Sequence, residues 1–171
     1  VQNDLINLLQ KENVSCVLTT TSFSTISFDE AHYQKIIWDR INIPVFQMLS
    51  STRNKEEWEK SSRGLNPIDF SLQVVLPELD GRITTRIGSF RESSISDEQL
   101  CTFIEEYKPY SHGIAWIANH IKSWITLSNK LNSNKKVAII VANYPVSDGR
   151  LANGVGLDTP QSLFNIITWL K

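Results

Sequence analysis

One stretch of the sequence decides how we expect the chain to fold, and it reads Val74-Val75-Leu76-Pro77-Glu78-Leu79-Asp80-Gly81-Arg82-Ile83. An apolar run ends there in a proline, two carboxylates, a glycine and an arginine. Proline fixes φ and glycine permits positive φ, so we expect the backbone to hold one shape. Acids at the rim of a rigid apolar segment are typical of a functional site. A plain surface turn closed by Asp-Gly explains the same residues.

The chain before this stretch alternates between helical and strand patterns. Apolar spacing predicts, in order, helix 2–11, strand 14–18, helix 29–41, strand 45–49 and a short helix 54–62. Hydroxyl-rich loops at 19–25 and 50–52 follow the two strands. Such hydroxyls either bind a substrate carboxylate or phosphate, or satisfy the backbone of a turn. The alternation predicts an α/β fold, a mostly parallel sheet flanked by helices with Rossmann-like or flavodoxin-like layering.

The pattern continues through the second half of the chain. It predicts a helix from Pro67 to about Val75, although residues 72–76 are also compatible with a strand, and then a strand at 82–90. A polar linker at 91–97 is followed by a helix that is capped by Ser96, breaks at Pro109 and resumes to about Leu131. The chain then continues with a buried parallel strand at 137–142, a long glycine-bearing loop at 143–160 and a final helix capped by Asp158 or Thr159. Long loops of this kind are usually functional or mobile.

Composition limits the class of protein. The 171 residues carry a net charge of −1, which argues against a nucleic-acid partner and against an anionic membrane surface. No apolar run reaches the length of a membrane span. We expect a single α/β domain over residues 1–171. Because the chain begins with Val1 and its one methionine is Met48, we also expect it to be an internal slice of a longer protein.

Cysteines, histidines and glycines exclude several common sites. Cys16 and Cys101 have no metal-knuckle spacing and are expected to be buried free thiols, which suits a cytoplasmic protein. His112 and His120 are eight residues apart, too far for the paired ligands of a zinc helix. No Gly-Lys-Ser/Thr motif follows a strand, so there is no P-loop. The glycines of 154–156 match a dinucleotide fingerprint only in part.

Two stretches together resemble a known family. The first joins Gly64-Leu65-Asn66-Pro67 to the segment 74–83, and the second comprises 136–145, Asp148-Gly149-Arg150 and 153–160. Their order and separation resemble the large, porphyrin-binding subunit of ATP-dependent cobaltochelatase. The magnesium chelatase large subunit is a more distant relative, and it shares the Leu-Pro-Glu-Leu-Asp-Gly part better than the loop. The resemblance covers nearly the whole chain and is weakest at 91–130, where Pro109-Tyr110-Ser111-His112-Gly113 stands apart.

The resemblance implies a parent enzyme that inserts Co²⁺, as the substrate metal, into a corrin precursor, hydrogenobyrinic acid a,c-diamide, in cobalamin biosynthesis. Such an enzyme is a ligase that forms nitrogen–metal bonds. The large subunit would hold the corrin or porphyrin-type tetrapyrrole, while AAA+ partner subunits use ATP and Mg²⁺. The absence of a P-loop agrees with that division of labour. The isolated fragment is expected to be inactive.

The site residues follow from the same resemblance and from the chemistry of insertion. A cation must be delivered by a carboxylate or imidazole, and a base must take two pyrrole protons. Glu78 is the first candidate for metal ligand and catalytic base, with Asp80 second. Arg82, Asp148 and Arg150 are candidates for substrate binding, the arginines by pairing with carboxylates of the macrocycle. The alternative is a non-catalytic scaffold, docking or tetrapyrrole-binding domain of a magnesium-chelatase-like subunit.

Overall fold

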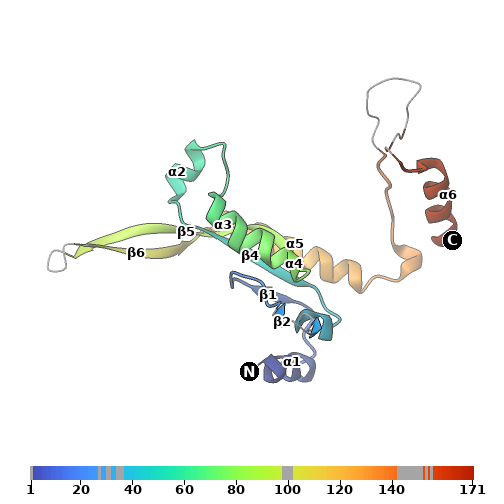
Figure 1. Cartoon of the computed structure of the whole chain (residues 1–171), viewed down its shortest axis with the longest axis horizontal. Coiled ribbons are helices and arrows are strands. Elements are labelled where there is room, and N and C mark those ends of the chain that lie inside the picture. Colours follow the sequence, from blue (N-terminus) through green and yellow to red (C-terminus); the bar gives the residue numbers. More distant parts are fainter. Residues whose placement is uncertain are drawn as a thin grey trace. The chain divides into compact units, whose positions relative to one another are not determined.

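The computed structural model describes residues 2–26, 28–29, 32–33, 37–97, 102–141, 152, 154 and 156–171. Contacts between Cα atoms divide the chain into two compact units, Val1–Lys130 and Leu131–Lys171. Figure 1 shows the elements of both units in chain order.

A four-stranded sheet forms the centre of the first unit. It consists of β1 (Val17–Thr19), β4 (Val45–Ser51), β5 (Ile83–Asp97) and β6 (Thr102–Pro109), in that spatial order. The first three strands are parallel, and β6 returns antiparallel to β5. β4 is almost entirely buried, as expected for an interior strand with apolar side chains on both faces. The sheet is therefore mostly parallel, as the sequence predicts.

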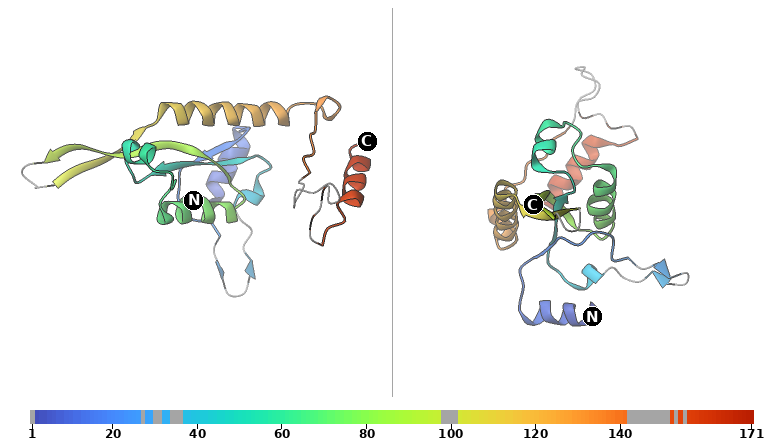
Figure 2. Two further views of the ribbon diagram at one scale, coloured as in Figure 1. Left: turned by 90° about the horizontal axis from the view of Figure 1, so that it is seen from above. Right: turned by 90° about the vertical axis from the view of Figure 1, so that its left-hand side faces the viewer.

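Helices cover both faces of this sheet, which confirms the predicted α/β class. Helix α5 (Ser111–Ser128) packs on one face, and a continuous helical stretch from Pro67 to Leu79 packs on the other (Figure 2). The core beneath the second helix consists of Leu49, Val74, Ile87 and Phe90. On the α5 side, the ring of buried Phe46 meets the edge of Trp124 at 6.0 Å.

The helical stretch changes its pitch in the middle. It runs through α3 (Pro67–Phe70), a π-helical turn η2 (Ser71–Val75) and α4 (Leu76–Leu79). Pro77 has no N–H for the carbonyl of Gln73, and its ring crowds that carbonyl, so a widened turn before it is the physical consequence. The buried Gln73 side chain accepts from the Ser50 N–H at 2.8 Å and donates to the Ser50 carbonyl at 2.7 Å.

Several helical predictions agree with the structure and one does not. Helices α1 (Gln2–Lys11) and α2 (Lys55–Lys60) lie where the sequence predicts them, and β1 begins three residues later than expected. The predicted helix at 29–41 is wrong for the described residues. A short antiparallel pair, β2 (Phe28–Asp29) with β3 (His32–Tyr33), is followed by a single 3₁₀ turn, η1 (Ile37–Arg40).

The predicted linker at 91–97 and the helix capped by Ser96 are also wrong. Ser96 and Asp97 belong to β5, which pairs with β6 as a long hairpin (Figure 1), and Gln99 lies outside the described residues. The Arg91 guanidinium lies 3.1 Å from the Glu105 carboxylate across the two strands. Residues 91–97 are polar except Ile95, so they lack the period-2 alternation that identifies a strand in a sequence.

The second unit contains a 3₁₀ turn, an extended segment and a helix. These are η3 (Asn132–Asn134), residues 135–141, and α6 (Thr159–Trp169). The strand predicted at 137–142 is extended but unpaired over 137–141, and residue 142 lies outside the described part. Asp158 caps α6, accepting from the Gln161 N–H at 3.0 Å. No helix among the described residues has the length and apolar character needed to cross a bilayer.

Candidate functional site

The turn after α4 is closed by a glycine. Gly81 has φ of +73° and its N–H donates to the Glu78 carbonyl at 3.0 Å, while the Arg82 N–H donates to the Pro77 carbonyl at 3.3 Å. A residue with positive φ after the last helical turn is the common way to end a helix and satisfy its terminal carbonyls. The turn delivers the chain directly into β5.

Asp80 is buried in this turn and points at the hydroxyl-rich loop after β1. Its carboxylate accepts from the Ser24 hydroxyl, from the Thr25 N–H at 2.7 Å and from the Thr25 hydroxyl at 2.9 Å. The Arg82 guanidinium lies 2.8 Å from the same carboxylate. Burial alone raises the pKa of Asp80, but hydrogen bonds from Ser24, Thr25 and Arg82 outweigh it and hold the pKa below its ordinary value.

Arg82 completes the network. Its side chain is 1% exposed and donates to the Thr21 carbonyl at 2.9 Å, to Gln47 Oε1 at 3.0 Å and to the Phe23 carbonyl at 3.1 Å. The sequence-predicted pair Asp80 and Arg82 therefore comes together, but it lies inside the protein. The network joins the loop at 19–25, strand β4 at Gln47, and the turn between α4 and β5.

A second buried aspartate does the same for the next loop. Asp69, in the first turn of α3, accepts from the Thr52 N–H at 3.0 Å and from the Thr52 hydroxyl at 2.7 Å. The Asn66 side chain donates to it at 2.9 Å. In both loops, then, the threonine hydroxyls satisfy an aspartate of the neighbouring helix. At Thr25 and Thr52, the hydroxyl-rich loops therefore use their hydroxyls to hold the fold together and not to bind a ligand.

Glu78 differs from both aspartates because it is exposed. The Thr84 hydroxyl donates to its carboxylate at 2.9 Å, and the side chain otherwise faces solvent. A carboxylate in this setting is free to bind a cation or accept a proton. Asp148 and Arg150 lie outside the described residues. Among the residues that are described, no group of three or more His, Cys, Asp and Glu side chains is placed to hold a metal ion.

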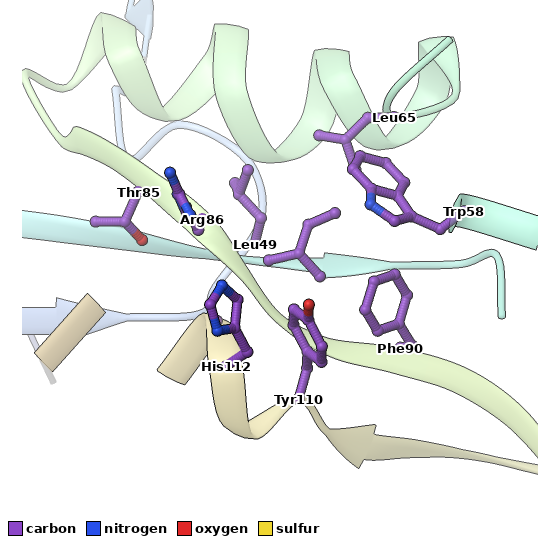
Figure 3. A pocket seen from close by; sticks show the side chains of 10 residues that line it. Leu49, Trp58, Leu65, Thr85, Arg86, Phe90, Tyr110 and His112 are labelled. Carbon is purple, nitrogen blue, oxygen red and sulfur yellow. The ribbon is translucent and has the colours of Figure 1, made fainter. Parts of the chain in front are cut away.

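A pocket of about 480 Å³ opens beside the sheet, and sequence reasoning missed it. We call it the aromatic pocket, and its lining is Leu49, Trp58, Leu65, Thr85, Arg86, Ile87, Phe90, Tyr110, His112 and Gly113. Figure 3 shows Trp58 and Phe90 at one end, Arg86 and His112 at the other, and Tyr110 between them. The size lies within the range of small-molecule sites.

The aromatic end of the pocket is held by ring contacts. Phe90 meets Tyr110 edge-on at 5.2 Å between centroids, and Trp58 lies 6.0 Å from Phe90. The Tyr110 N–H donates to the Gly88 carbonyl at 2.7 Å, which fixes the entry into α5. Gly113 allows α5 to approach β5, because a Cβ at this position would overlap the carbonyl oxygen of Ile87.

The polar end carries positive charge. The Arg86 guanidinium stacks on the Trp116 ring at 4.4 Å, and the described residues that line the pocket include no carboxylate. The Lys55 ammonium lies 5.5 Å from the Tyr110 ring centroid. A flat apolar ligand with a carboxylate at its edge fits this combination of aromatic walls and an exposed guanidinium. The sequence feature that could have indicated this pocket is the segment Pro109-Tyr110-Ser111-His112-Gly113, where the resemblance to the family is weakest.

Known proteins match the chain along its whole length. The model of the family described as CobN/Magnesium Chelatase matches residues 1–171. The aerobic cobaltochelatase subunit CobN of Pseudomonas aeruginosa is 34% identical over 163 residues, covering 95% of this chain and 13% of that protein. The chloroplastic magnesium-chelatase subunit ChlH of Oryza sativa subsp. indica is 27% identical over 173 residues, covering 94% of this chain and 11% of that protein.

A solved structure agrees. The catalytic subunit of cobaltochelatase from Mycobacterium tuberculosis superposes with a TM-score of 0.79 and 25% identity, covering 98% of this chain and 14% of that one. These matches define the class as a segment of the large chelatase subunits. The chain belongs to the CobN/magnesium chelatase family, and it spans only a small part of the curated relatives it matches.

Proposed function

We propose that this chain is a tetrapyrrole-holding segment of a metal chelatase large subunit, and that its parent inserts Co²⁺ into hydrogenobyrinic acid a,c-diamide during cobalamin biosynthesis. The observation that carries the cobalt assignment is the higher identity to cobaltochelatase than to magnesium chelatase over nearly the same share of the chain. The reaction class is a ligation that forms nitrogen–metal bonds.

The aromatic pocket supports tetrapyrrole binding. A corrin precursor is a large apolar ring system with carboxylate side chains at its edge. Rings of Trp58, Phe90 and Tyr110 offer the apolar contact, and Arg86 offers a bidentate donor for one carboxylate. Substrate contacts by Asp148 and Arg150 remain part of the proposal, from the resemblance of their loop.

The metal-free corrin ring carries one ionisable N–H, so one proton must leave the ring nitrogens for each Co²⁺ bound, where a porphyrin would release two. Glu78 is the proposed acceptor and delivery ligand, because it is an exposed carboxylate with one neutral hydrogen-bond partner. Asp80 was the second candidate. Its burial and its four hydrogen-bond donors favour a positioning role, in which it holds the turn that presents Glu78.

The energy source lies outside this chain in the proposal. AAA+ partner subunits bind ATP with Mg²⁺ and drive the remodelling, which is consistent with the lack of a P-loop sequence here. The free thiol of Cys16, whose pKa is raised by burial, suits a reducing cytoplasm.

A second function is favoured by one specific observation. Asp80 and Arg82, two residues of the motif that carries the resemblance, are buried and bonded to one another. The motif therefore contributes to the fold, and the segment would then be a scaffold or tetrapyrrole-binding domain whose catalytic groups lie elsewhere in the parent.

Cobalt insertion by the full-length parent with its ATPase partners tests the two candidates. We expect Glu78→Gln to reduce turnover by tenfold or more, on the order of a lost general base, while tetrapyrrole affinity stays unchanged. Glu12→Gln, at an exposed glutamate of the N-terminal segment, is the matched control. Full turnover in Glu78→Gln would favour the scaffold function. Insertion of Mg²⁺ in preference to Co²⁺ would contradict the cobalt assignment.

A further inference from the structure

The second unit exposes an unusually apolar extended segment. Residues 137–141 read Val-Ala-Ile-Ile-Val, and Val137 and Ile140 are 64% and 93% exposed. Helix α6 and the residue that follows it expose further large apolar side chains, namely Phe164, Ile167, Trp169 and Leu170. Single apolar residues scattered on a surface are ordinary, whereas several consecutive exposed apolar residues are typical of a surface that another segment covers.

The order of residues in this segment indicates which of its faces should be buried. Side chains alternate between the two faces of an extended chain, so Val137, Ile139 and Val141 lie on one face and Ala138 and Ile140 on the other. Both faces are apolar, which is the pattern of an interior strand of a parallel sheet. An edge strand usually carries a charge or a proline within it, and residues 137–141 contain neither.

The chain order points to the same architecture. Residues 137–141 precede helix α6 in the chain, which is the order of elements in the first half of a β-α-β unit. The other half, a parallel strand beside residues 137–141, is absent from the described residues. Relatives extend far beyond the matched segment, because this chain covers 13% of CobN and 14% of the solved cobaltochelatase subunit.

We propose that residues 137–141 form an interior strand of a second parallel sheet, whose neighbouring strands come from the parent polypeptide outside residues 1–171, with α6 packed on one face. A second copy of the chain fits less well, because pairing between two copies covers one edge of the strand and leaves the other open. This inference rests on family membership and on the exposed segment, and it does not depend on the proposed cobalt chemistry.

Amide hydrogen exchange of the full-length parent tests the pairing. We expect the amides of residues 137–141 to exchange at least about a hundredfold more slowly in the parent than in chain 1–171, because hydrogen-bonded interior strands open only rarely. The protection should not depend on protein concentration or on added ATPase partner. Rapid exchange in the parent would overturn the proposal. So would equal protection in chain 1–171, or protection that appears only with concentration or partner.

A pair of variants in the parent provides the second test. Ile140→Lys places a charge on the face that the proposal buries, whereas Leu131→Lys changes a residue that is 71% exposed and lies outside the strand. We expect Ile140→Lys to lower the soluble yield or the midpoint of thermal unfolding by several degrees, and Leu131→Lys to leave both unchanged. Indistinguishable behaviour of the two variants would overturn the proposal. In chain 1–171 neither substitution should change the midpoint.

Discussion

Two arginines four residues apart show how differently one segment can use the same side chain. Arg82, just before β5, is 1% exposed and bonds to Asp80, Gln47 and two loop carbonyls. Arg86, inside β5, is exposed and rests on the Trp116 ring at the mouth of the aromatic pocket. The arginine of the motif serves the fold, and the arginine outside the motif is available to a ligand.

The largest expected effect separates the two arginines by stability. Arg82→Ala leaves the Asp80 carboxylate buried without its cation and frees the loop at 19–25, so we expect a loss of about 3–5 kcal/mol in the free energy of unfolding. Arg86→Ala should change it by about 1 kcal/mol or less, the size of an exposed cation–π contact with Trp116. Urea unfolding followed by tryptophan fluorescence measures both. Equal losses would refute the distinction between them.

The acid side of the same network gives the next largest effect. Because the pKa of folded Asp80 lies below the ordinary value of about 3.9, its ion pair contributes stability above that pH, and the contribution is lost as the pH falls through the folded pKa. Asp80→Asn should cost about 2–3 kcal/mol at neutral pH, the size of a charge-assisted hydrogen bond.

Unfolding measured at several pH values tests the sign. Below a pH of about 4, the free energy of unfolding should fall less steeply for Asp80→Asn than for the unsubstituted chain, because the variant lacks one titrating carboxylate. Thr25→Val, which removes one donor and keeps the carboxylate, is the control and should retain the acid dependence. An unchanged slope in Asp80→Asn would contradict the assignment of the acid dependence to this residue.

A smaller effect is expected for ligand binding at the open arginine. Arg86→Gln should weaken the binding of a carboxylate-bearing tetrapyrrole about tenfold, equivalent to about 1.4 kcal/mol, with little change in stability. Quenching of tryptophan fluorescence measures it, because Trp58 lines the pocket. Arg91→Gln, on the β5–β6 arm, is the matched control. Equal affinity of the two variants would remove the aromatic pocket from the proposed substrate site.

The smallest expected effect concerns Glu78. Because its side chain is exposed and has one hydroxyl partner, Glu78→Gln should change the free energy of unfolding by less than about 0.5 kcal/mol. Thermal unfolding of the variant gives the value directly. A loss of more than 2 kcal/mol would mean that Glu78 supports the fold, as Asp80 does, and would undermine its proposed catalytic role.

The sheet and its covering helices were predictable because their signals are local. Apolar runs identify β4, and Pro67 with Asn66 marks the start of the helix that covers it. The β5–β6 arm was missed because residues 91–97 are almost all polar and show no alternation, and because Ser96 with Gln99 imitates the sequence of a helix cap. Residues 137–141 were predicted as a strand but pair with no strand among the described residues, because strand pairing depends on a neighbour and not on the segment's own pattern.

The candidate site was predictable only in part. Proline, acid and glycine at 77–81 indicated a turn, which the structure has at Gly81, but spacing says nothing about which side chain the fold buries. Asp80 is taken up by donors from a loop 55 residues earlier, a contact that no local pattern encodes. Arg86 and His112 meet only because α5 packs across β5 at Gly113, so their proximity is a property of the tertiary structure.

The Gln73 side chain has a consequence for how the helix and the sheet keep their register. A primary amide carries the same donor and acceptor as a peptide group, and Gln73 presents both to the N–H and carbonyl of Ser50, beside the irregularity in the β4–β5 ladder. The Gln73 side chain, which belongs to a helix, therefore makes the same pair of hydrogen bonds to Ser50 of β4 that one peptide group of a neighbouring strand would make. Neither a carboxylate nor an ammonium at this position has both groups, so the two-sided match belongs to the amide alone.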